Sequence, residues 1–267
     1  MRIDTHAHVF TRNCPLAADR RYDPEGEAPL ETYLRLLDRH GLSHGVLIQP
    51  SFLGTDNRYL MAALEQEPDR LRGVAVIGPD IGKRDLRRLA EAGVVGIRLN
   101  LLGRERGVDL SGPEWRRLFA QVTDLDWLIE VHGEGPALSP VLAVLSETRV
   151  RIVIDHFGRP DARRGVSCNG FADLLRAAEG GRIWVKLSAP YRCRGADVRP
   201  YAEVLLANLG PGRLLWGSDW PWTQHADGMA YVKAFGWLED WVPDDAARAA
   251  ILGQTPEALF RFVTAAA

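Results

Sequence analysis

The feature that most constrains this chain is a regular alternation of short apolar runs with longer amphipathic stretches. Eight runs rich in β-branched and other apolar residues each end at glycine, proline or polar residues. They lie at residues 3–9, 45–49, 73–77, 94–99, 127–131, 151–154, 183–187 and 214–216. Near-continuous apolar runs of this length are typical of strands that are buried on both faces of a parallel sheet.

The stretches between these runs place apolar residues at the spacing of a helix face. They predict helices at residues 30–40, 59–67, 86–92, 115–125, 138–145, 171–178, 201–209, 231–241, 244–252 and 256–263. Thr255 is expected to cap the last of these helices, with Pro256 in its first turn. Strands that alternate with helices predict a parallel sheet, and eight repeats predict a closed (β/α)8 TIM barrel of the α/β class.

The length of 267 residues suits one such barrel, whose usual size is about 250 residues. We therefore expect a single domain over residues 1–267, in which residues 11–29 form a long loop after the first strand. The main alternative is an open, doubly wound sheet, which would place a glycine-rich phosphate turn after the first strand. The sequence has Asp-Thr-His-Ala-His at residues 4–8 instead, and this favours the barrel.

Composition and charge argue against several classes of partner. The formal net charge is −2, from 33 basic and 35 acidic residues, which gives no indication of nucleic acid or of an anionic membrane. The three cysteines are too widely spaced for a disulfide framework or a zinc ribbon. The sequence has no signal-peptide pattern and no apolar run long enough to span a bilayer. We expect a cytoplasmic protein with free thiols, either a monomer or a homodimer.

Polar residues gather where the predicted strands end, which is where barrel enzymes carry their chemistry. Seven of the eight runs follow this pattern. The residues are Asp4, His6 and His8; Gln49 and Ser51; Arg98 and Asn100; His132 and Glu134; Asp155 and His156; Lys186 and Ser188; and Ser218 and Asp219. One such placement could be an accident, but its repetition on most strands predicts an active site at this end of the barrel.

Three histidines and one aspartate are the candidates for catalysis. His6 and His8 are two residues apart on a strand, so both imidazoles face the same way, where they can bind a divalent metal or polarise a carbonyl. His156 follows an apolar strand, and on its own it could equally be a buried histidine bonded to backbone. Asp219 lies between two tryptophans and could act as a general base or simply as a turn residue. Its histidine partners favour the catalytic role.

Arginines indicate an anionic substrate. Arg98 ends a buried strand, where a permanent charge requires a partner. The partner could be a substrate carboxylate, which a guanidinium can bind through two hydrogen bonds, or a barrel carboxylate such as Glu130 or Glu134. Arg104 and Arg192 lie in loops, and for either of them exposure to solvent is as good an interpretation as substrate binding.

Five sequence blocks together resemble the amidohydrolase superfamily (amidohydrolase-2 type), and within it the branch of the 2-pyrone-4,6-dicarboxylate lactonases. They are DTHAHVF at 4–10, IQPS at 48–51 with GTDN at 54–57, GIRLN at 96–100, IDHFGRPD at 154–161 and WGSDWP at 216–221. The blocks follow the family's order from the first strand to the eighth. The resemblance implies a (β/α)8 barrel hydrolase that opens the lactone ester of a carboxylated cyclic substrate by means of a water molecule activated by an aspartate.

The resemblance also implies roles for individual residues. Asp219 would activate the water, and the lactone carbonyl and carboxylate would be bound and polarised by His6, His8 and His156. The substrate carboxylates would be bound by Arg98, Arg104 and Arg192 with Ser51 and Tyr22. Two positions depart from the family pattern: His132 replaces a tyrosine at the end of the fifth strand, and Trp222 replaces a usual histidine. Both lie near the expected substrate, so the natural lactone can differ from the pyrone dicarboxylate.

The need for a metal is the most open question. Most of the superfamily binds one or two divalent ions through residues that correspond to His6, His8, His156 and Asp219. The pyrone lactonase branch works without one, and arginines can supply the positive charge, so we expect that no cofactor is required. Zinc or manganese at those four residues is the alternative. Alternative functions are a zinc-dependent decarboxylase or sugar-lactone hydrolase on the same barrel, or a non-catalytic protein that binds a carboxylated metabolite.

Overall fold

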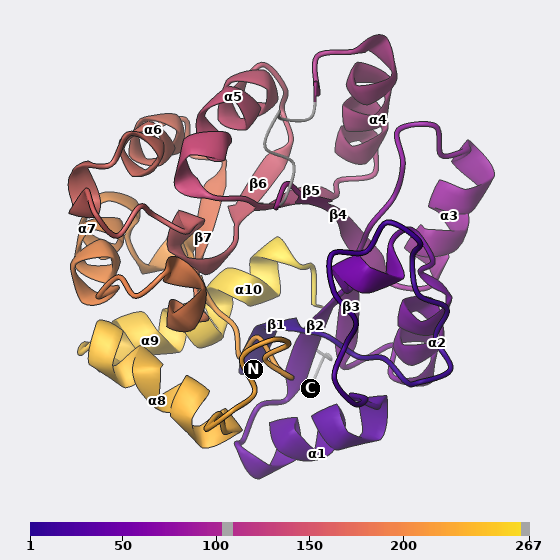
Figure 1. Cartoon of the computed structure of the whole chain (residues 1–267), viewed down its shortest axis with the longest axis horizontal. Helices are drawn as coiled ribbons and strands as arrows, with labels where there is room; N and C mark the ends of the chain where they lie inside the picture. Colours follow the sequence, from indigo (N-terminus) through magenta and orange to yellow (C-terminus); the bar gives the residue numbers. More distant parts are fainter. Residues whose placement is uncertain (103–108, 263–267) are drawn as a thin grey trace.

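The computed structural model describes residues 1–102 and 109–262, and its centre is an eight-stranded parallel barrel. The strands are β1 (Ile3–Ala7), β2 (His44–Ile48), β3 (Leu71–Ala75), β4 (Val94–Asn100), β5 (Leu128–His132), β6 (Arg151–Ile154), β7 (Ile183–Leu187) and β8 (Leu214–Trp216). Each strand pairs with the next one along the chain, and Figure 1 shows the ring that results, with helices outside it. The predicted (β/α)8 barrel is confirmed, since every apolar run forms a strand.

The barrel closes between its first and last strands through backbone bonds just beyond the end of β8. The amide of Asp219 donates to the carbonyl of His6 at 2.8 Å, and the amide of His8 donates to the carbonyl of Trp220 at 2.7 Å. Gly217 permits this close approach, because a Cβ there would lie 2.5 Å from the Cβ of His6. Closure therefore brings the segment after β8 directly against His6.

Helices surround the barrel and close one end of it. They are α1 (Leu30–Arg39), α2 (Arg58–Gln66), α3 (Lys83–Glu91), α4 (Pro113–Asp124), α5 (Gly135–Ser146), α6 (Asn169–Ala178), α7 (Arg199–Leu209), α8 (Tyr231–Trp241), α9 (Asp245–Leu252) and α10 (Gln254–Leu259). The prediction that Thr255 caps the last helix is wrong: α10 begins at Gln254, and the Thr255 hydroxyl donates to the carbonyl of Pro211 at 2.9 Å. Within the described ranges, no helix combines the length and the apolar character needed to cross a membrane.

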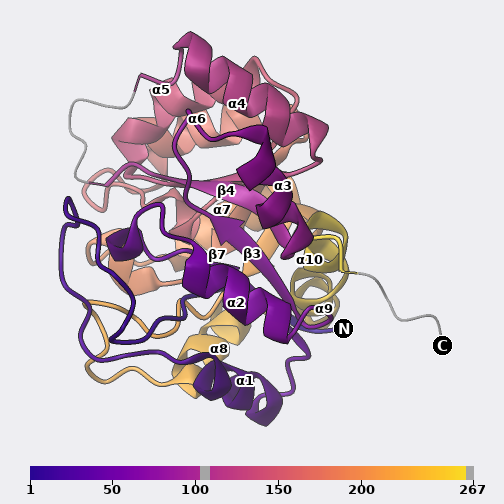
Figure 2. The same cartoon turned by 90° about the vertical axis from the view of Figure 1, so that its right-hand side faces the viewer.

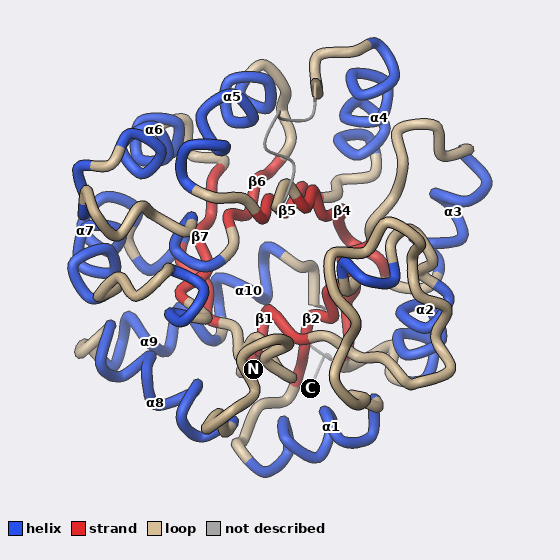
Figure 3. Tube along the Cα trace, in the orientation of Figure 1, coloured by secondary structure: helices blue, strands red, loops and turns tan. Residues whose placement is uncertain are grey.

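The barrel interior is apolar in its lower part and charged above. In Figure 3, α10 lies behind the ring of strands, where its end packs against inward-facing side chains. This lower cluster comprises Ile3, Val46, Ile48, Val74, Val95, Leu128, Val153, Leu215, Leu259, Phe260 and Phe262. Above it the interior holds His6, Arg98, Glu130, Asp155 and Lys186, all buried. The apolar cluster thus separates the charged layer from one end of the barrel and leaves the opposite end for the site.

The long segment between β1 and α1 lies over that opposite end. Figure 2 shows this indigo loop on the side of the barrel away from the N-terminus, which is where the strands end. Phe10 and Ala28 close the base of the loop through an antiparallel bridge. Within the loop, the Tyr22 hydroxyl donates to the Thr223 hydroxyl at 3.0 Å, so the loop contacts the segment after β8. The predicted loop 11–29 therefore contributes to the mouth of the barrel.

Candidate active site

The four predicted catalytic residues meet at the end of the barrel. The Nε2 atoms of three histidines face the same atom, Oδ1 of Asp219, at 3.5 Å from His6, 3.7 Å from His8 and 3.8 Å from His156. All four residues are buried; His8 retains the most exposure, at 5%. They come from three separate parts of the chain: β1 with the residue that follows it, the segment after β6 and the segment after β8.

An unusual backbone conformation orients two of these side chains towards the others. His156 and Asp219 have φ values of 52° and 56°, in the left-handed region that residues other than glycine seldom adopt. Such strain persists where the surrounding structure holds the backbone in place, and it is concentrated at functional sites. Here the amide of Asp219 is held by the carbonyl of His6, and the His156 ring is held by a hydrogen bond of 2.8 Å between its Nδ1 and the Ser188 hydroxyl.

Asp219 is held as an anion. Burial is the largest single cause and raises the pKa of this carboxyl, but Arg192 and the three neighbouring histidines together outweigh burial, and the pKa lies well below its ordinary value. Arg192 Nε donates to Oδ2 at 2.6 Å, and the Tyr191 hydroxyl donates to the same oxygen at 2.7 Å. The other oxygen, Oδ1, has no hydrogen-bond partner within the described residues. Asp219 therefore presents an ionised, unshared oxygen that can accept a proton from water.

The histidines of the site are neutral. Burial is the largest cause that lowers the pKa of His6, His8, His132 and His156, and it brings the pKa of His156 to about 3. A neutral imidazole carries one N–H donor and one lone pair, so it can donate to an oxyanion, accept a proton or bind a metal. The site therefore combines an anionic base with neutral polar groups around it.

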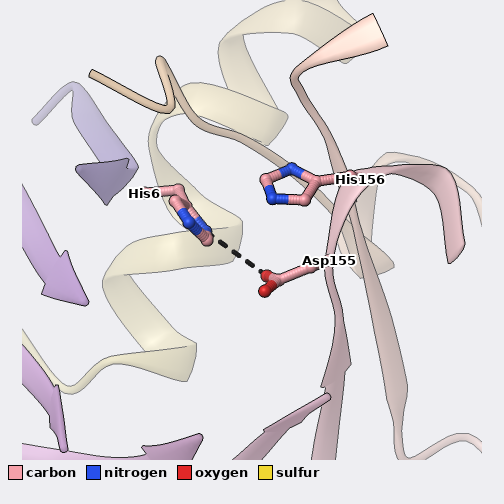
Figure 4. Close-up of side chains that lie close together, drawn as sticks. All are labelled: His6, Asp155 and His156. Atoms are coloured by element: carbon pink, nitrogen blue, oxygen red, sulfur yellow. Dashed lines mark ion pairs between the residues drawn. The ribbon is translucent and has the colours of Figure 1, made fainter. Parts of the chain in front are cut away.

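A layer of paired charges lies directly beneath these residues. Arg98 bonds to Asp155 Oδ2 at 2.7 Å and lies 3.4 Å from Glu130 Oε1. Lys186 donates to Glu130, and its Nζ lies 3.0 Å from Nδ1 of His6. Figure 4 shows the Asp155 carboxylate and the His156 ring both facing His6. Two cations and two carboxylates thus support the floor of the site.

The sequence had suggested Glu130 or Glu134 as the alternative partner of Arg98. Glu130 is a partner, but the shorter contact is to Asp155, and Glu134 instead pairs with Arg159 and Arg194. The structural roles of Asp155 and Lys186 were missed. The available signal was the presence of charged residues inside or at the ends of apolar runs.

A polar cavity opens above the catalytic group. It is lined by His8, Arg21, Tyr22, Pro50, Ser51, Phe52, Arg98, His132, His156, Arg192, Asp219 and Thr223. The predicted substrate-binding residues Ser51, Tyr22 and His132 therefore lie in one cavity with Arg98 and Arg192. Arg104 lies outside the described residues. Arg98 and Arg192 already hold carboxylates of the protein, Asp155 and Asp219, which the sequence did not reveal for Arg192.

A second basic cavity adjoins the first and shares Arg192 with it. It is lined by Glu134, Arg159, Pro160, Asp161, Ala162, Arg163, Arg192 and Arg194. Arg159 joins the two cavities: its NH1 lies 3.4 Å from Nε2 of His132, and its buried Nε has no hydrogen-bond partner within the described part of the chain. Arg159 was not among the residues predicted from the sequence, although it lies in the loop that carries His156.

The catalytic group also fits a divalent cation in ligand type and spacing. A tetrahedral zinc site with bonds of about 2.0–2.1 Å to nitrogen or oxygen separates its ligand atoms by about 3.4 Å. The distances of 3.5–3.8 Å from Asp219 Oδ1 to the three histidines are close to this value. His6, His8 and Asp219 form one such group of possible ligands, and His6, Asp155 and His156 form another.

Comparison with known proteins places this geometry in a family. A family model described as Amidohydrolase matches residues 3–262. The chain belongs to the amidohydrolase family. The resemblance inferred from the sequence blocks is thereby confirmed, and the match spans the barrel from the first strand to the end of the described chain.

Relatives of this amidohydrolase include lactone hydrolases. It is 33% identical to a 4-sulfomuconolactone hydrolase of Rhizobium radiobacter, over 96% of this chain and 89% of the relative. It is 30% identical to a 2-pyrone-4,6-dicarboxylate hydrolase of Comamonas testosteroni, over 90% of this chain and 82% of the relative. A crystal structure described as a probable 2-pyrone-4,6-dicarboxylic acid hydrolase from Acinetobacter baumannii, with citric acid bound, superimposes with a TM-score of 0.93. The two chains are 36% identical, and the superposition covers 98% of this chain and 99% of the other.

Proposed function

We propose that this amidohydrolase opens the lactone ring of a small cyclic substrate that carries carboxylate or similar anionic groups. The observation that carries the proposal is the environment of Asp219. Its carboxylate is buried and bonded to Arg192, and its second oxygen faces three neutral histidines beneath a cavity lined with arginines. The names of two relatives, a sulfomuconolactone hydrolase and a pyrone dicarboxylate hydrolase, support the same reaction class.

Each step of the reaction uses one of these groups. Water attacks the carbonyl carbon of the lactone, and Asp219 Oδ1 accepts one of its protons. The negative charge that develops on the carbonyl oxygen is stabilised by N–H donors of the site. The bond between the carbonyl carbon and the ring oxygen then breaks, and the ring oxygen takes the proton back from Asp219. The product is an open chain with a hydroxyl group and a new carboxylic acid, which becomes a carboxylate when it releases the second water proton to solvent. The same residues can catalyse the reverse reaction.

The basic residues around the cavity would select the anionic groups. Arg192, Arg98, Ser51 and Tyr22 line the catalytic cavity, and Arg159 leads from it into the second basic cavity. A substrate with two anionic groups could place one in each cavity. The citric acid bound to the relative from Acinetobacter baumannii supports a polycarboxylate ligand. His132, which lines the catalytic cavity, would then adapt it to a lactone other than the pyrone dicarboxylate, whereas Trp222 is not among the lining residues.

We also propose that no metal is required, because arginines and histidine N–H groups can supply the positive potential that the reaction needs. A divalent cation held by His6, His8, His156 and Asp219 would add Lewis acidity at the carbonyl. The three cysteines are free thiols, which is consistent with the proposed location in the reducing cytoplasm.

A spectrophotometric screen of carboxylated lactones, with and without chelator and with elemental analysis of the purified protein, tests this function. We expect ring opening by the wild type and by Asp227→Asn, an exposed aspartate in the loop after β8. Asp219→Asn should lose about 10²–10⁴-fold in turnover. Binding without turnover would indicate a non-catalytic protein. Activity that a chelator removes and zinc restores would favour the metal-dependent alternatives, and near-normal turnover by Asp219→Asn would refute the mechanism.

A further inference from the structure

The hydrogen bond behind His8 fixes which of its ring nitrogens carries the proton. Nδ1 of His8 lies 2.8 Å from the carbonyl oxygen of Ile48. A carbonyl oxygen can only accept, so Nδ1 must be the protonated nitrogen and Nε2 must hold the lone pair. That lone pair faces Oδ1 of Asp219, a second acceptor, at 3.7 Å. Two acceptors at this separation suit a molecule that donates two hydrogens, and water is such a molecule.

At His6 the hydrogen bond to Nδ1 comes from a donor instead of going to an acceptor. Nδ1 of His6 lies 3.0 Å from Nζ of Lys186, which is fully buried and also bonded to Glu130. An ammonium group can only donate, so a hydrogen bond from Lys186 requires that Nδ1 of His6 accept and that the ring proton be on Nε2. Nε2 lies in the site, 3.5 Å from Asp219 Oδ1. With this hydrogen bond, His6 presents an N–H to the reacting groups, whereas His8 presents a lone pair.

Asp155 offers His6 the alternative arrangement. Oδ1 of Asp155 lies 3.3 Å from the same Nδ1, the contact drawn as a dashed line in Figure 4. If Nδ1 carried the proton and donated it to Asp155, Nε2 would hold a lone pair, which is the form that a metal-binding histidine takes. The contact to Lys186 is the shorter one, and 3.3 Å is longer than a good charge-assisted hydrogen bond to a carboxylate.

We propose that Lys186 is a positioning residue that fixes His6 in the Nε2–H tautomer, opposite to that of His8. The inference rests on the proposed lactone hydrolysis and divides the work between the two histidines. His8 and Asp219 hold the two hydrogens of the attacking water, and His6 donates its N–H to the carbonyl oxygen of the lactone. In this tautomer Nε2 of His6 carries a proton and has no lone pair with which to bind a cation. Lys186 would therefore also make the site independent of metal.

The tautomers can be measured directly on the wild-type protein. Long-range ¹H–¹⁵N correlation spectra of the full chain labelled with [¹⁵N]histidine distinguish protonated from unprotonated ring nitrogens, and His6→Gln and His8→Gln assign the signals. We expect protonated Nε2 in His6 and protonated Nδ1 in His8. The same tautomer in both residues would overturn the proposal. This measurement needs no substrate, so its failure is distinct from failure of the proposed function.

A charge-balanced variant tests the role of Lys186. Lys186→Met combined with Glu130→Gln removes the ammonium without leaving its carboxylate partner ionised, and Glu130→Gln alone is the matched control. In the double variant His6 should change to the Nδ1–H tautomer, kcat should fall about 10²-fold or more while KM changes little, and bound zinc after dialysis should rise. The control should keep the tautomer and the low zinc content. An unchanged His6 spectrum in a folded double variant would refute the proposal, and the wild-type spectrum still decides if the variant does not fold.

Discussion

Replacing Arg192 with methionine should raise the pKa of Asp219 and move the acidic limb of the pH–rate profile upward. Arg192 Nε lies 2.6 Å from Asp219 Oδ2, and the carboxylate is fully buried. An opposite charge at this range lowers a carboxyl pKa by about one to three units, against the rise that burial causes. Without Arg192 the pKa should therefore rise by at least this amount, and each unit is worth about 1.4 kcal/mol.

The assay is kcat/KM against pH for a lactone that the wild type hydrolyses, because this parameter reports the pKa values of the free enzyme. The wild type should keep an ionised base through mildly acidic pH, whereas Arg192→Met should lose about tenfold per pH unit below its raised pKa. Arg194→Met is the matched control, since Arg194 is 69% exposed and pairs with Glu134 rather than with Asp219. An acidic limb at the same pH in all three proteins would refute the reasoning, whatever happens to KM.

Three further predictions concern stability and strand closure. Gly217→Ala places a Cβ 2.5 Å from the Cβ of His6, so it should cost about 1–3 kcal/mol in unfolding free energy and reduce turnover; unchanged urea unfolding would contradict this. Ser218→Ala removes the 2.6 Å hydrogen bond to the buried Asp4 carboxylate and should cost about 1–3 kcal/mol in the same assay. Burial lowers the pKa of His156 to about 3. The contribution of neutral His156 to the free energy of unfolding is therefore complete above pH 6.5, the pKa of the unfolded state, and is lost as the pH falls towards 3. At pH 5.5 this loss is about 1.4 kcal/mol, measured as the extra pH dependence of urea unfolding in the wild type over His156→Gln.

The fold could be predicted from the sequence because strands covered on both faces remain apolar throughout. The apolar run at residues 183–187 coincides with β7, and the run at 73–77 lies two residues later than β3 (Leu71–Ala75). The first strand shows the limit of the alternation rule. The pairing of β1 shifts in register between Asp4 and Ala7, so Asp4 bonds to Ser218 and to Tyr231 of α8 instead of reaching the site.

The site was predictable to the extent that strand ends identify residues, and not beyond that. His6 and Asp219 could be selected because each lies near the end of a strand, His6 within β1 and Asp219 just beyond β8, and the ends of parallel strands meet. The partner of Arg192 could not be found in this way, because the contact depends on a loop conformation that carries no periodic signal. Arg159 was missed for a related reason: an arginine between glycine and proline has the pattern of an exposed turn, yet its Nε is buried. Arg104 stays a prediction.

The closure of the barrel and the assembly of the chemistry are one event in this chain. The residues that join the two edges of the sheet, His6 with Asp219 and His8 with Trp220, include three of the proposed catalytic residues. A nascent chain carries its histidines long before the last strand is synthesised, and it has no active centre until that strand docks. Recovery of turnover after dilution from denaturant would therefore report the final step of refolding.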